Sequence, residues 1–360
     1  MPKRTVHTPL GSLLLTEEDG HLTDISWSHI REESTTPLLE NAARELHDFL
    51  GANRRGFTLP YKFTKGTVFQ QKVWQEIAAI PYGEIRTYSQ LAQTLGSHAR
   101  AVGTACGKNP LPILVPCHRV VGKSGKLRGY SGGDGVLTKE LLLSFEKHEG
   151  ERSKTTPIFD TLRAKIPQKP FYLMRHGQTD LNIRKILQGR SIDTALNKAG
   201  IEQAQRAGLA LRDIFNPLEV WHSDMHRARQ TAEEVIKQLS KAERKVVGHD
   251  KLAERSFGAY DGKSPHEVSP LQDVWQSNPE GETWCGFTHR LAHGLIEVLS
   301  QSKTTPLVVS HGAASNCITE FLADFPRDKF MNNCQIWYVE PVEKSPFRPW
   351  RIKQVYAGEK

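Results

Sequence analysis

Apolar and polar positions follow different patterns in the two halves of this chain. Near the start, two apolar runs flank the polar stretch EEDG at residues 17–20, a pattern typical of a β-hairpin. From Pro37 onward the periodicity of the first half is mostly helical. In the second half, FYLM at 171–174 and TPLVVSH at 305–311 predict strands, with helical patterns between them at 198–215 and 226–241. This alternation favours a parallel α/β sheet.

A polar, proline-bearing stretch at residues 147–170 separates the two patterns of apolar and polar positions. A length of 360 residues suits two domains better than one. We therefore predict an α/β multidomain protein with a first domain at 1–149, a linker at 150–169 and a second domain at 170–360. The first domain divides into an N-terminal subdomain at 1–64, with a small β-hairpin sheet, and a second subdomain at 65–149. No internal repeat is evident.

The second subdomain carries a pattern typical of DNA-binding proteins. TYSQLAQTLG at 87–96 and ARAVGTACGKNP at 99–110 read as two helices joined by a short glycine-containing turn, which fits a helix-turn-helix. The apolar run ILVP at 113–116 then predicts a buried strand that ends at a proline, directly before Cys117 and His118.

Composition narrows the class of protein. With 38% hydrophobic and 24% charged residues, and no run of about 18 apolar residues, the chain does not read as a membrane protein. Its first residues lack the apolar core of a secretory signal, which predicts a cytoplasmic location with reduced thiols. None of the five cysteines has CxxC spacing, so we expect no structural zinc and no redox dithiol.

The net charge of +8 is unevenly distributed. Residues 65–133 hold nine Lys and Arg against two Asp and Glu, and this segment contains the helix-turn-helix pattern. A basic patch there favours a polyanion partner such as nucleic acid, and a solvated basic face is the alternative.

Cys117 and His118 are adjacent, and a histidine next to a cysteine can draw off the thiol proton and create a nucleophile. Glu146, on the helical run TKELLLSFEKH, is the candidate carboxylate for the far side of the imidazole. Taken alone, a cysteine after an apolar run is more often core filling. The flanking motifs decide between these interpretations.

FQQKVWQEIAAIPYGEIRTYSQLA, ARAVGTACGKNP, PCHRVVG and GYSGG, in this order, resemble the O6-alkylguanine-DNA alkyltransferases over residues 5–149. The resemblance implies a repair protein without cofactor or metal. Its Cys117 irreversibly accepts the methyl group of O6-methylguanine, and of O4-methylthymine, in double-stranded DNA. His118 would deprotonate the thiol through a water, oriented by Glu146. The implied DNA-binding and base-binding residues are Tyr88, Arg100, Asn109, Arg119, Tyr130 and Ser131.

Two departures from that family pattern affect the expected site. DGVLTK at 134–139 makes the interval before Glu146 a couple of residues longer than the pattern, which leaves the role of this carboxylate open. No cysteine precedes Cys106, so the N-terminal zinc site of some relatives is not expected.

The second half places histidines and arginines at the ends of predicted strands. FYLMRHGQTDLN, HSDMHRARQTA and LVVSHG carry Arg175, His176, Arg227 and His311. Arginine forks and histidines at strand ends would surround a dianion, although each residue alone reads as an ordinary loop residue.

Together with LAERSFGAYDG and NPEGETW, these motifs resemble the histidine phosphatase superfamily, the phosphoglycerate mutase-like fold, over residues 170–357. The resemblance implies a three-layer α/β/α domain that needs no metal. His176 would be the nucleophile, Glu254 the proton donor, and Arg175, Arg227 and His311 the phosphate cradle. Further substrate-binding residues would be Asn182, Gln188 and Glu282. The shortness of the domain favours hydrolysis of a small phosphorylated metabolite over a mutase reaction.

The leading hypothesis is thus a repair alkyltransferase fused to a phosphatase. The alternatives are an alkylated-DNA sensor that does not repair, a phosphatase targeted to DNA by its first domain, and an inert second domain. The sequence does not decide the oligomeric state or whether the two domains are coupled.

Overall fold

The computed structural model describes residues 1–360 except 9, 29, 31, 51–52, 126, 128, 148–159, 265–266, 269–279, 324–330, 343–349 and 359–360. The chain divides into two compact units. The first is Met1–Thr161 with Thr283–Cys285, and the second is the remainder from Leu162 to Lys360. Both mix helices and strands, so the predicted α/β class is confirmed.

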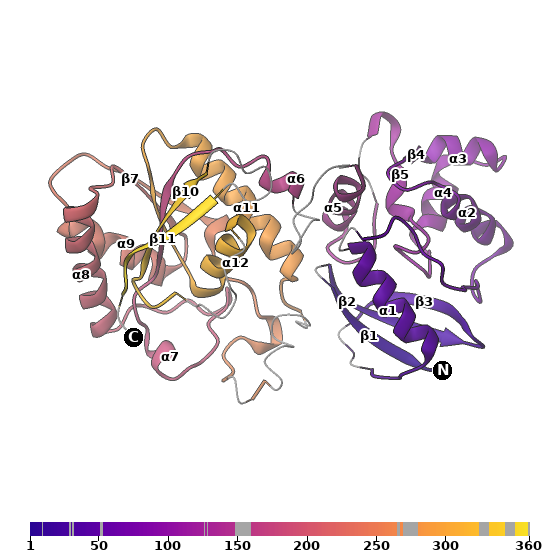
Figure 1. Cartoon of the computed structure of the whole chain (residues 1–360), viewed down its shortest axis with the longest axis horizontal. Coiled ribbons are helices and arrows are strands. Elements are labelled where there is room, and N and C mark those ends of the chain that lie inside the picture. Colours follow the sequence, from indigo (N-terminus) through magenta and orange to yellow (C-terminus); the bar gives the residue numbers. More distant parts are fainter. Residues whose placement is uncertain are drawn as a thin grey trace. The chain divides into compact units, whose positions relative to one another are not determined.

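The first unit opens with an antiparallel sheet of three strands in the order β1-β2-β3, namely β1 (Lys3–Thr8), β2 (Gly11–Glu18) and β3 (His21–Trp27). The turn between β2 and β3 has positive φ at Asp19 and Gly20, as a tight hairpin requires. The predicted hairpin is therefore confirmed. Helix α1 (Pro37–Leu50) starts at the predicted proline and packs against β1 and β2 (Figure 1).

Three helices follow in the first unit, α2 (Val68–Ala78), α3 (Tyr88–Thr94) and α4 (Ala99–Cys106). Thr67 and Thr87 form capping boxes that start α2 and α3. The indole of Trp74 on α2 donates to the carbonyl of Ala105 on α4, at 2.8 Å. The two predicted helices of the helix-turn-helix are both present, as α3 and α4. The remaining elements are β4 (Arg86–Thr87), η1 (Cys117–Arg119), β5 (Val120–Val121), η2 (Lys123–Gly125) and α5 (Val136–Lys147).

The buried strand predicted before Cys117 is wrong. Residues 111–115 are turns and bends, and the only short strand nearby within the described chain, β5, comes after the cysteine. Ile113 has a φ of 73°, outside the β region. Pro112 and Pro116 also lack the N–H groups that a sheet ladder needs. The apolar side chains are buried as predicted, but the backbone that carries them is irregular.

The second unit contains a six-stranded sheet in the order β11-β10-β6-β9-β7-β8. Four neighbouring strands of this sheet are parallel to one another, as predicted, and they are β6, β9, β7 and β8. Strands β10 and β11 add an antiparallel pair at the other edge, which corrects the expectation of a wholly parallel sheet. The strands are β6 (Phe171–Arg175), β7 (Glu219–Ser223), β8 (Lys245–His249), β9 (Leu307–Ser310), β10 (Ile336–Pro341) and β11 (Trp350–Tyr356).

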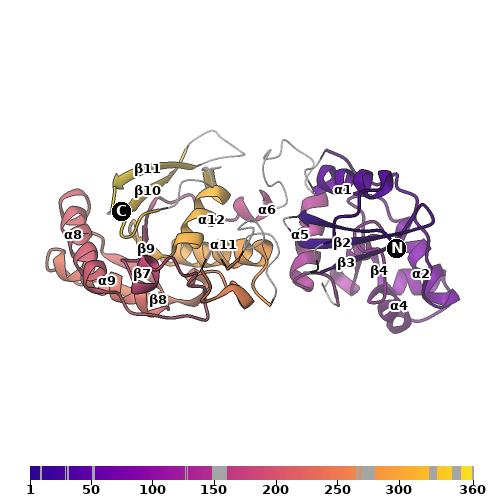
Figure 2. The same cartoon turned by 90° about the horizontal axis from the view of Figure 1, so that it is seen from below.

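Helices cover both faces of this sheet. Alternate residues of β6 and β9, such as Met174 and Val309, form one core with helices α8 and α9, while Leu173 and Val308 between them are fully buried on the opposite face. Figures 1 and 2 show α8 and α9 on one side of the sheet and α11 and α12 on the other. The helices of this unit are α6 (Asp160–Arg163), α7 (Asp180–Ile183), α8 (Lys198–Ile214), α9 (His226–Gln238), α11 (Trp284–Gln301) and α12 (Gly312–Ala323), with 3₁₀ turns η4 (Asp250–Leu252) and η5 (Gly258–Tyr260).

Of the linker predicted at 150–169, residues 150–159 lie outside the described residues. Its remaining part is packed rather than extended, because Leu162, Arg163 and Ile166 are buried in the second unit. The second unit therefore begins about eight residues before the predicted boundary at 170. Among the described helices, none is both long and apolar enough to cross a membrane.

The start of α8 contacts the loop after β6 so closely that only glycine fits. A Cβ atom added to Gly200 would lie 2.1 Å from the carbonyl oxygen of Gln178, and one added to Gly177 would lie 2.5 Å from that of Gly200. Both obstacles are backbone atoms, which cannot rotate away. This contact fixes the loop that follows β6 against α8.

Gly200→Ala is therefore expected to lower the free energy of unfolding by about 1–3 kcal/mol, because the new methyl group forces the two backbones apart. Urea unfolding followed by circular dichroism measures the change. Gly56→Ala is the control, since nothing lies within 4 Å of its added Cβ. An unchanged unfolding midpoint for Gly200→Ala would contradict the close packing.

Candidate active sites

The first site is built around Cys117, which is buried at the start of η1. Its backbone N–H donates to the carbonyl of Val115 at 2.8 Å, and the amide of Asn109 donates to the same carbonyl at 2.8 Å. Asn109 also accepts from the N–H of Leu111 at 3.1 Å. The end of α4 and the turn before the cysteine are thus held together by one asparagine side chain.

Cys117, His118 and Glu146 form a buried chain, which we call the thiol site. Nε2 of His118 donates to Oε1 of Glu146 at 2.7 Å, and both side chains are almost fully buried. Nδ1 of His118 is buried and makes no hydrogen bond to the described protein. The two extra residues before Glu146 do not displace this carboxylate from the histidine.

Arg119 completes the thiol site from the side opposite His118. Its guanidinium donates to both oxygens of Glu146, at 2.8 and 3.0 Å, and to the carbonyl of Ile80 at 2.6 Å. The side chain is only 8% exposed. A guanidinium committed in this way is not available to DNA, so we correct the expected DNA contact of Arg119 to a role in holding Glu146.

Burial and neighbouring charges shift the pKa values of these groups in opposite directions. Burial raises the pKa of Glu146, but the hydrogen bonds and charges of His118 and Arg119 outweigh it and lower the pKa to about 2. Burial lowers the pKa of His118 and raises the pKa of Cys117, while a hydrogen bond from Asn109 and the charge of Lys139 act to lower that of the thiol. The resting site therefore holds a neutral thiol, a neutral imidazole and an ionised carboxylate.

Lys139 is a member of this site that the sequence did not indicate. It lies on α5 seven residues before Glu146, which puts both side chains on one helix face. Its side chain is fully buried, and Nζ donates to the hydroxyl of Tyr88 at 3.2 Å. Burial lowers the pKa of Lys139, and the nearby Cys117 and Cys106 thiols raise it. The spacing from Glu146 is the signal that could have found it.

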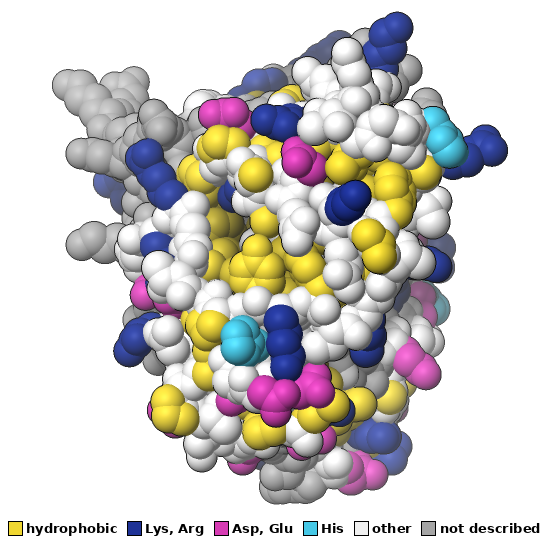
Figure 3. All heavy atoms as spheres, turned by 90° about the vertical axis from the view of Figure 1, so that its right-hand side faces the viewer, with side chains coloured by type: hydrophobic (Ala, Val, Ile, Leu, Met, Phe, Trp, Pro, Cys, Tyr) yellow, Lys and Arg dark blue, Asp and Glu magenta, His cyan; other side chains and the backbone are white. Residues whose placement is uncertain are grey.

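The other predicted residues of the first unit surround the cysteine at different depths. The Tyr88 hydroxyl lies 3.5 Å from the carbonyl of Gly129, and Ser131 donates to the carbonyl of Gly107 at 3.3 Å. The Tyr130 hydroxyl is buried without a hydrogen bond to the described protein. Arg100 is exposed on the second residue of α4. On the face of the first unit drawn in Figure 3, Lys and Arg side chains stand around a central apolar area and are not gathered in one block.

The second site forms where β6 and β9 end side by side. Arg175 pairs with Ser310 in the parallel ladder, and His176 and His311 follow these two residues. Their rings face each other with centroids 5.2 Å apart, and we call this the two-histidine site. Parallel neighbours present their carboxyl ends at one edge of a sheet, which explains why residues far apart in the chain meet here.

His176 is held as a neutral imidazole. Its Nδ1–H donates to the carbonyl of Gly177 at 2.7 Å, which leaves Nε2 with a free electron pair. Burial lowers the pKa of His176 well below its usual value, and the charges of Arg227 and Arg175 lower it further. The same influences lower the pKa of His311, and both of its ring nitrogens are buried without a hydrogen bond to the described protein.

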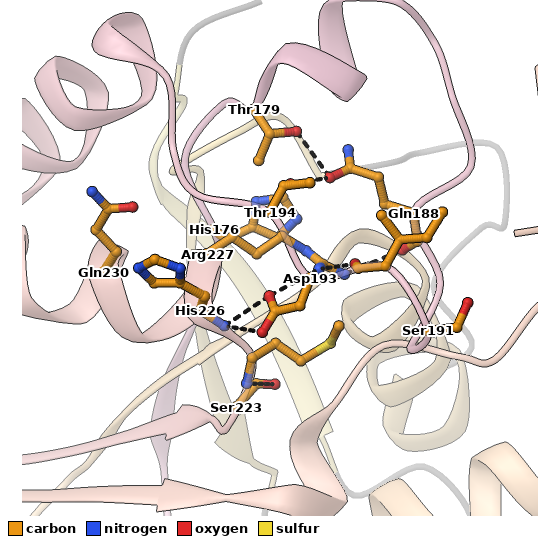
Figure 4. A network of polar contacts seen from close by, with 12 residues as sticks. His176, Thr179, Gln188, Ser191, Asp193, Thr194, Ser223, His226, Arg227 and Gln230 are labelled. Carbon is orange, nitrogen blue, oxygen red and sulfur yellow. Dashed lines mark hydrogen bonds and ion pairs between the residues drawn. The ribbon is translucent and has the colours of Figure 1, made fainter. Parts of the chain in front are cut away.

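Arg227 is fixed by a loop that runs from Gln188 to Thr194 (Figure 4). The guanidinium donates to the carbonyls of Ile192 at 2.9 Å and Gln188 at 3.1 Å, and lies 3.6 Å from the Asp193 carboxylate. Asp193 also accepts from the N–H of His226 at the start of α9. The Nε–H of Arg227 remains buried and unpaired among the described atoms. Asp193 is a contributor that the sequence did not reveal.

Arg175 and the turn after β6 are tied to a distant segment of the chain. Arg175 donates to the carbonyl of Met331 at 2.6 Å, and its Nε is buried without a described partner. Asn333 donates to the carbonyl of His176 at 3.0 Å and lies 3.4 Å from Oδ1 of Asn182. Asn333 was not found from the sequence, because no pattern links it to the histidine motif.

Glu254 lies at the amino end of α12. Its two oxygens accept the N–H groups of Ala313 and Ala314, each at 3.1 Å, and the N–H of Arg255 at 2.9 Å. Burial nevertheless raises the pKa of Glu254, against the lowering effect of these hydrogen bonds. A buried carboxyl with a raised pKa is suited to hold a proton.

The three remaining predicted residues of the second unit are Gln188, Asn182 and Glu282, and each is held by neighbouring side chains. Gln188 accepts from the hydroxyls of Thr179 and Thr194 at 3.0 and 2.9 Å, and its buried Nε2 makes no described hydrogen bond. Thr179 is the N-cap of α7, and the side chain of Asn182 in the first turn accepts the backbone N–H of Thr179. Glu282 is engaged by Arg290 through two bonds of 2.8 Å, and Arg290 also donates to the carbonyl of Glu254 at 3.1 Å. Glu282 thus supports the segment that carries Glu254.

Comparison with known families agrees with both sites. Residues 68–148 match the model of the 6-O-methylguanine DNA methyltransferase, DNA binding domain, and residues 171–347 match that of the histidine phosphatase superfamily (branch 1). The constitutive methylated-DNA–protein-cysteine methyltransferase of Bacillus subtilis is 42% identical over 156 residues, which are 40% of this chain and 93% of that protein. The chain therefore belongs to this methyltransferase family through its first part, and its second part matches the model of the histidine phosphatase superfamily.

Two solved structures are also similar. A crystal structure of Mycobacterium tuberculosis OGT in complex with DNA is 38% identical, with a TM-score of 0.38, over 41% of this chain and 93% of that one. A phosphoglycerate mutase from Bacillus anthracis is 23% identical, with a TM-score of 0.44, over 52% of this chain and 92% of that one.

Glu146→Gln tests the electrostatic role of the carboxylate. Because the folded pKa of about 2 lies below the ordinary 4.5, the ionised group stabilises the fold at neutral pH, and this contribution is lost as pH falls from 4.5 towards 2. The variant is expected to unfold at lower urea than wild type at neutral pH, with a difference that shrinks over that acid range. Glu140→Gln, on the same helix but outside this network, is the control. A difference that does not change with pH would contradict the assignment.

Proposed function

We propose that the first unit repairs DNA by transferring the methyl group of O6-methylguanine, and of O4-methylthymine, in a duplex to Cys117. The observation that carries this proposal is the buried pair of Cys117 and His118, with Nε2 of His118 hydrogen-bonded to Glu146. The 42% identity to a methylated-DNA–protein-cysteine methyltransferase supports it.

The reaction follows from the groups present. His118 takes the thiol proton through a water at Nδ1, and ionised Glu146 stabilises the imidazolium that results. The thiolate attacks the methyl carbon, a C–S bond forms, and the bond from that carbon to O6 breaks. Tyr88 donates a hydrogen bond to the departing guanine, which takes up the proton that the thiol gave to His118, so the base leaves neutral. Because the product is a thioether, each molecule acts once.

Access to the buried thiol requires the base to leave the duplex. Flipping costs a few kcal/mol, and a side chain inserted into the stack offsets part of this. Exposed Arg100 on α4 is the residue we assign to that gap, and Tyr130 and Ser131 close the pocket behind the base. The related OGT has been crystallised with DNA, which supports a DNA partner for this unit.

Intact protein incubated with a methylated duplex is expected to gain one CH₂ in mass, because a methyl group replaces the thiol proton. Mass spectrometry of peptides should place the gain on Cys117. Cys106→Ala, which removes the other thiol of residues 1–161, should still be labelled on Cys117. A gain that persists in Cys117→Ala would refute the assignment.

For the second unit we propose hydrolysis of a small phosphomonoester through a phosphohistidine at His176. The observation that carries it is the position of His176, which is fixed by Gly177 and flanked by Arg175 and Arg227, whose buried Nε groups have no partner among the described residues. Nε2 attacks phosphorus and the bond to the leaving oxygen breaks, while Glu254 protonates that oxygen. Water then attacks phosphorus, the P–N bond breaks, and Glu254 takes the proton. Arg175, Arg227 and His311 hold the phosphoryl oxygens, and Asn182 and Gln188 line the site.

The shortness of the second unit favours hydrolysis over a mutase reaction. We further infer that the two activities belong to separate domains, at 1–149 and 170–360, and that the phosphatase substrate is a small phosphorylated metabolite. We infer that neither reaction needs a metal ion or a cofactor.

Hydrolysis of an aryl phosphate is expected to fall at least ~10³-fold in His176→Ala, because the covalent route is lost, and to persist in the presence of a chelator. Arg227→Ala should also lose most of its activity. Arg229→Ala is the matched control, since this arginine is exposed on the same helix. Activity that depends on added metal, or that survives in His176→Ala, would overturn the mechanism.

A further inference from the structure

A glycine-rich loop at residues 129–133, here called the pocket loop, is held from two directions. On one side, Ser131 donates to the carbonyl of Gly107, at the end of α4, and Tyr88 lies against the carbonyl of Gly129. On the other side it contacts Trp27, which belongs to the N-terminal sheet. The loop therefore lies between the helix-turn-helix and a strand that contributes nothing to the thiol site itself.

Trp27 is the last residue of β3 and is fixed in orientation. Its indole N–H donates to the carbonyl of Leu10 at 2.8 Å, and its backbone pairs with Leu13 of β2. An added Cβ at Gly11 would already be 3.4 Å from the indole. With one hydrogen bond and a packed neighbour, the ring cannot rotate without breaking both contacts.

The contact between Trp27 and the pocket loop requires glycine. A Cβ atom on Gly132 would lie 2.4 Å from the indole ring, and one on Gly133 would lie 2.9 Å from its Nε1. Gly133 also has a φ of +52°, which favours glycine independently. The edge of the Trp27 ring meets the ring of Tyr130, with centroids 6.3 Å apart and planes at 79°. The indole thus fills the space where loop side chains would otherwise be.

Tyr130 connects this contact to the chemistry. Its hydroxyl is buried and makes no hydrogen bond to the described protein. Burial raises the pKa of Tyr130, and the charge of Cys117 raises it further. The loop also meets the side chains of the thiol site directly, because the Tyr88 hydroxyl lies 3.5 Å from the carbonyl of Gly129 and accepts from Nζ of Lys139 at 3.2 Å. A displacement of the loop at Gly132 would therefore shift Tyr130 and the carbonyl that meets Tyr88.

We propose that Trp27 is a positioning residue that fixes the pocket loop and so sets the width of the base pocket beside Cys117. This inference rests on the alkyl-transfer function proposed above. It assigns to the N-terminal sheet a role in selecting the size of the alkyl group, without any contact between Trp27 and DNA. The contact between the indole and Gly132 is the feature that transmits this control.

The decisive experiment is a double-mutant cycle between Trp27→Ala and Gly132→Ala. Single-turnover methyl transfer at saturating methylated duplex gives the rate constant, and fluorescence anisotropy gives the Kd for the same DNA. Gly132→Ala is expected to slow transfer at least ~10-fold with Kd changed less than about twofold, because the methyl group pushes the loop off the indole. In the double variant, removal of the indole relieves the two closest contacts of the added methyl group and leaves the one with Cε1 of Tyr130, at 2.9 Å. Transfer should then be several-fold faster than the product of the two single effects.

A second readout separates pocket width from general destabilisation. The ratio of rate constants for the free bases O6-benzylguanine and O6-methylguanine should rise in Trp27→Ala and return towards wild type in Trp27→Phe. Phe57→Ala is the control, because it removes another half-buried aromatic side chain from the same subdomain, where it packs on Phe49 away from the loop. It should leave the ratio unchanged even if it lowers stability. This readout remains decisive if Gly132→Ala does not fold.

The outcomes are distinguishable. Strictly multiplicative single effects in the cycle would overturn the proposal, as would a benzyl-to-methyl ratio that is the same in Trp27→Ala and wild type. Failure of wild-type protein to transfer any methyl group would instead refute the function proposed for the first unit.

Discussion

The carboxylate of Glu146 is the interaction on which the first unit depends. It accepts four hydrogen bonds, from His118, twice from Arg119 and from the N–H of Gly83. These donors come from the turn after Cys117 and from the loop after α2, while Glu146 itself comes from α5. A buried anion would be costly without such partners, so the segments can only fold together. The same arrangement that stabilises the charge also orients the imidazole for the thiol.

The second unit solves the opposite problem, because the cations of Arg175 and Arg227 are gathered at one site, with the carboxylates of Glu254 and Asp193 near Arg227. Buried arginines and neutral histidines are unfavourable there, and the backbone compensates by offering carbonyl groups to the guanidinium forks of Arg175 and Arg227. The Nε groups of these two forks have no hydrogen-bond partner among the described residues. Groups with unmet hydrogen bonds favour binding of a ligand that meets them.

The sequence predicted features whose causes are local or follow from general rules of sheets. The hairpin at Asp19 and Gly20, the start of α1 at Pro37, and the ends of β6 and β9 at His176 and His311 are of this kind. The strand predicted before Cys117 failed because burial was read as regular structure. The expected DNA contact of Arg119 followed from the family resemblance, and the sequence did not show that this side chain is buried against Glu146, 27 residues away. Contacts such as Lys139 with Tyr88, or Trp27 with Gly132, join segments with no shared pattern, so they needed the fold.

The bond between Asn333 and His176 has a consequence for how the protein is made. The two residues are 157 positions apart, and Arg175 is joined to Met331 in the same way. His176 therefore has its support only after residues 331–333 have left the ribosome. The thiol site, in contrast, has all its members once Glu146 has emerged. Because domains fold in order during synthesis, the first site can be complete while the second is still being translated.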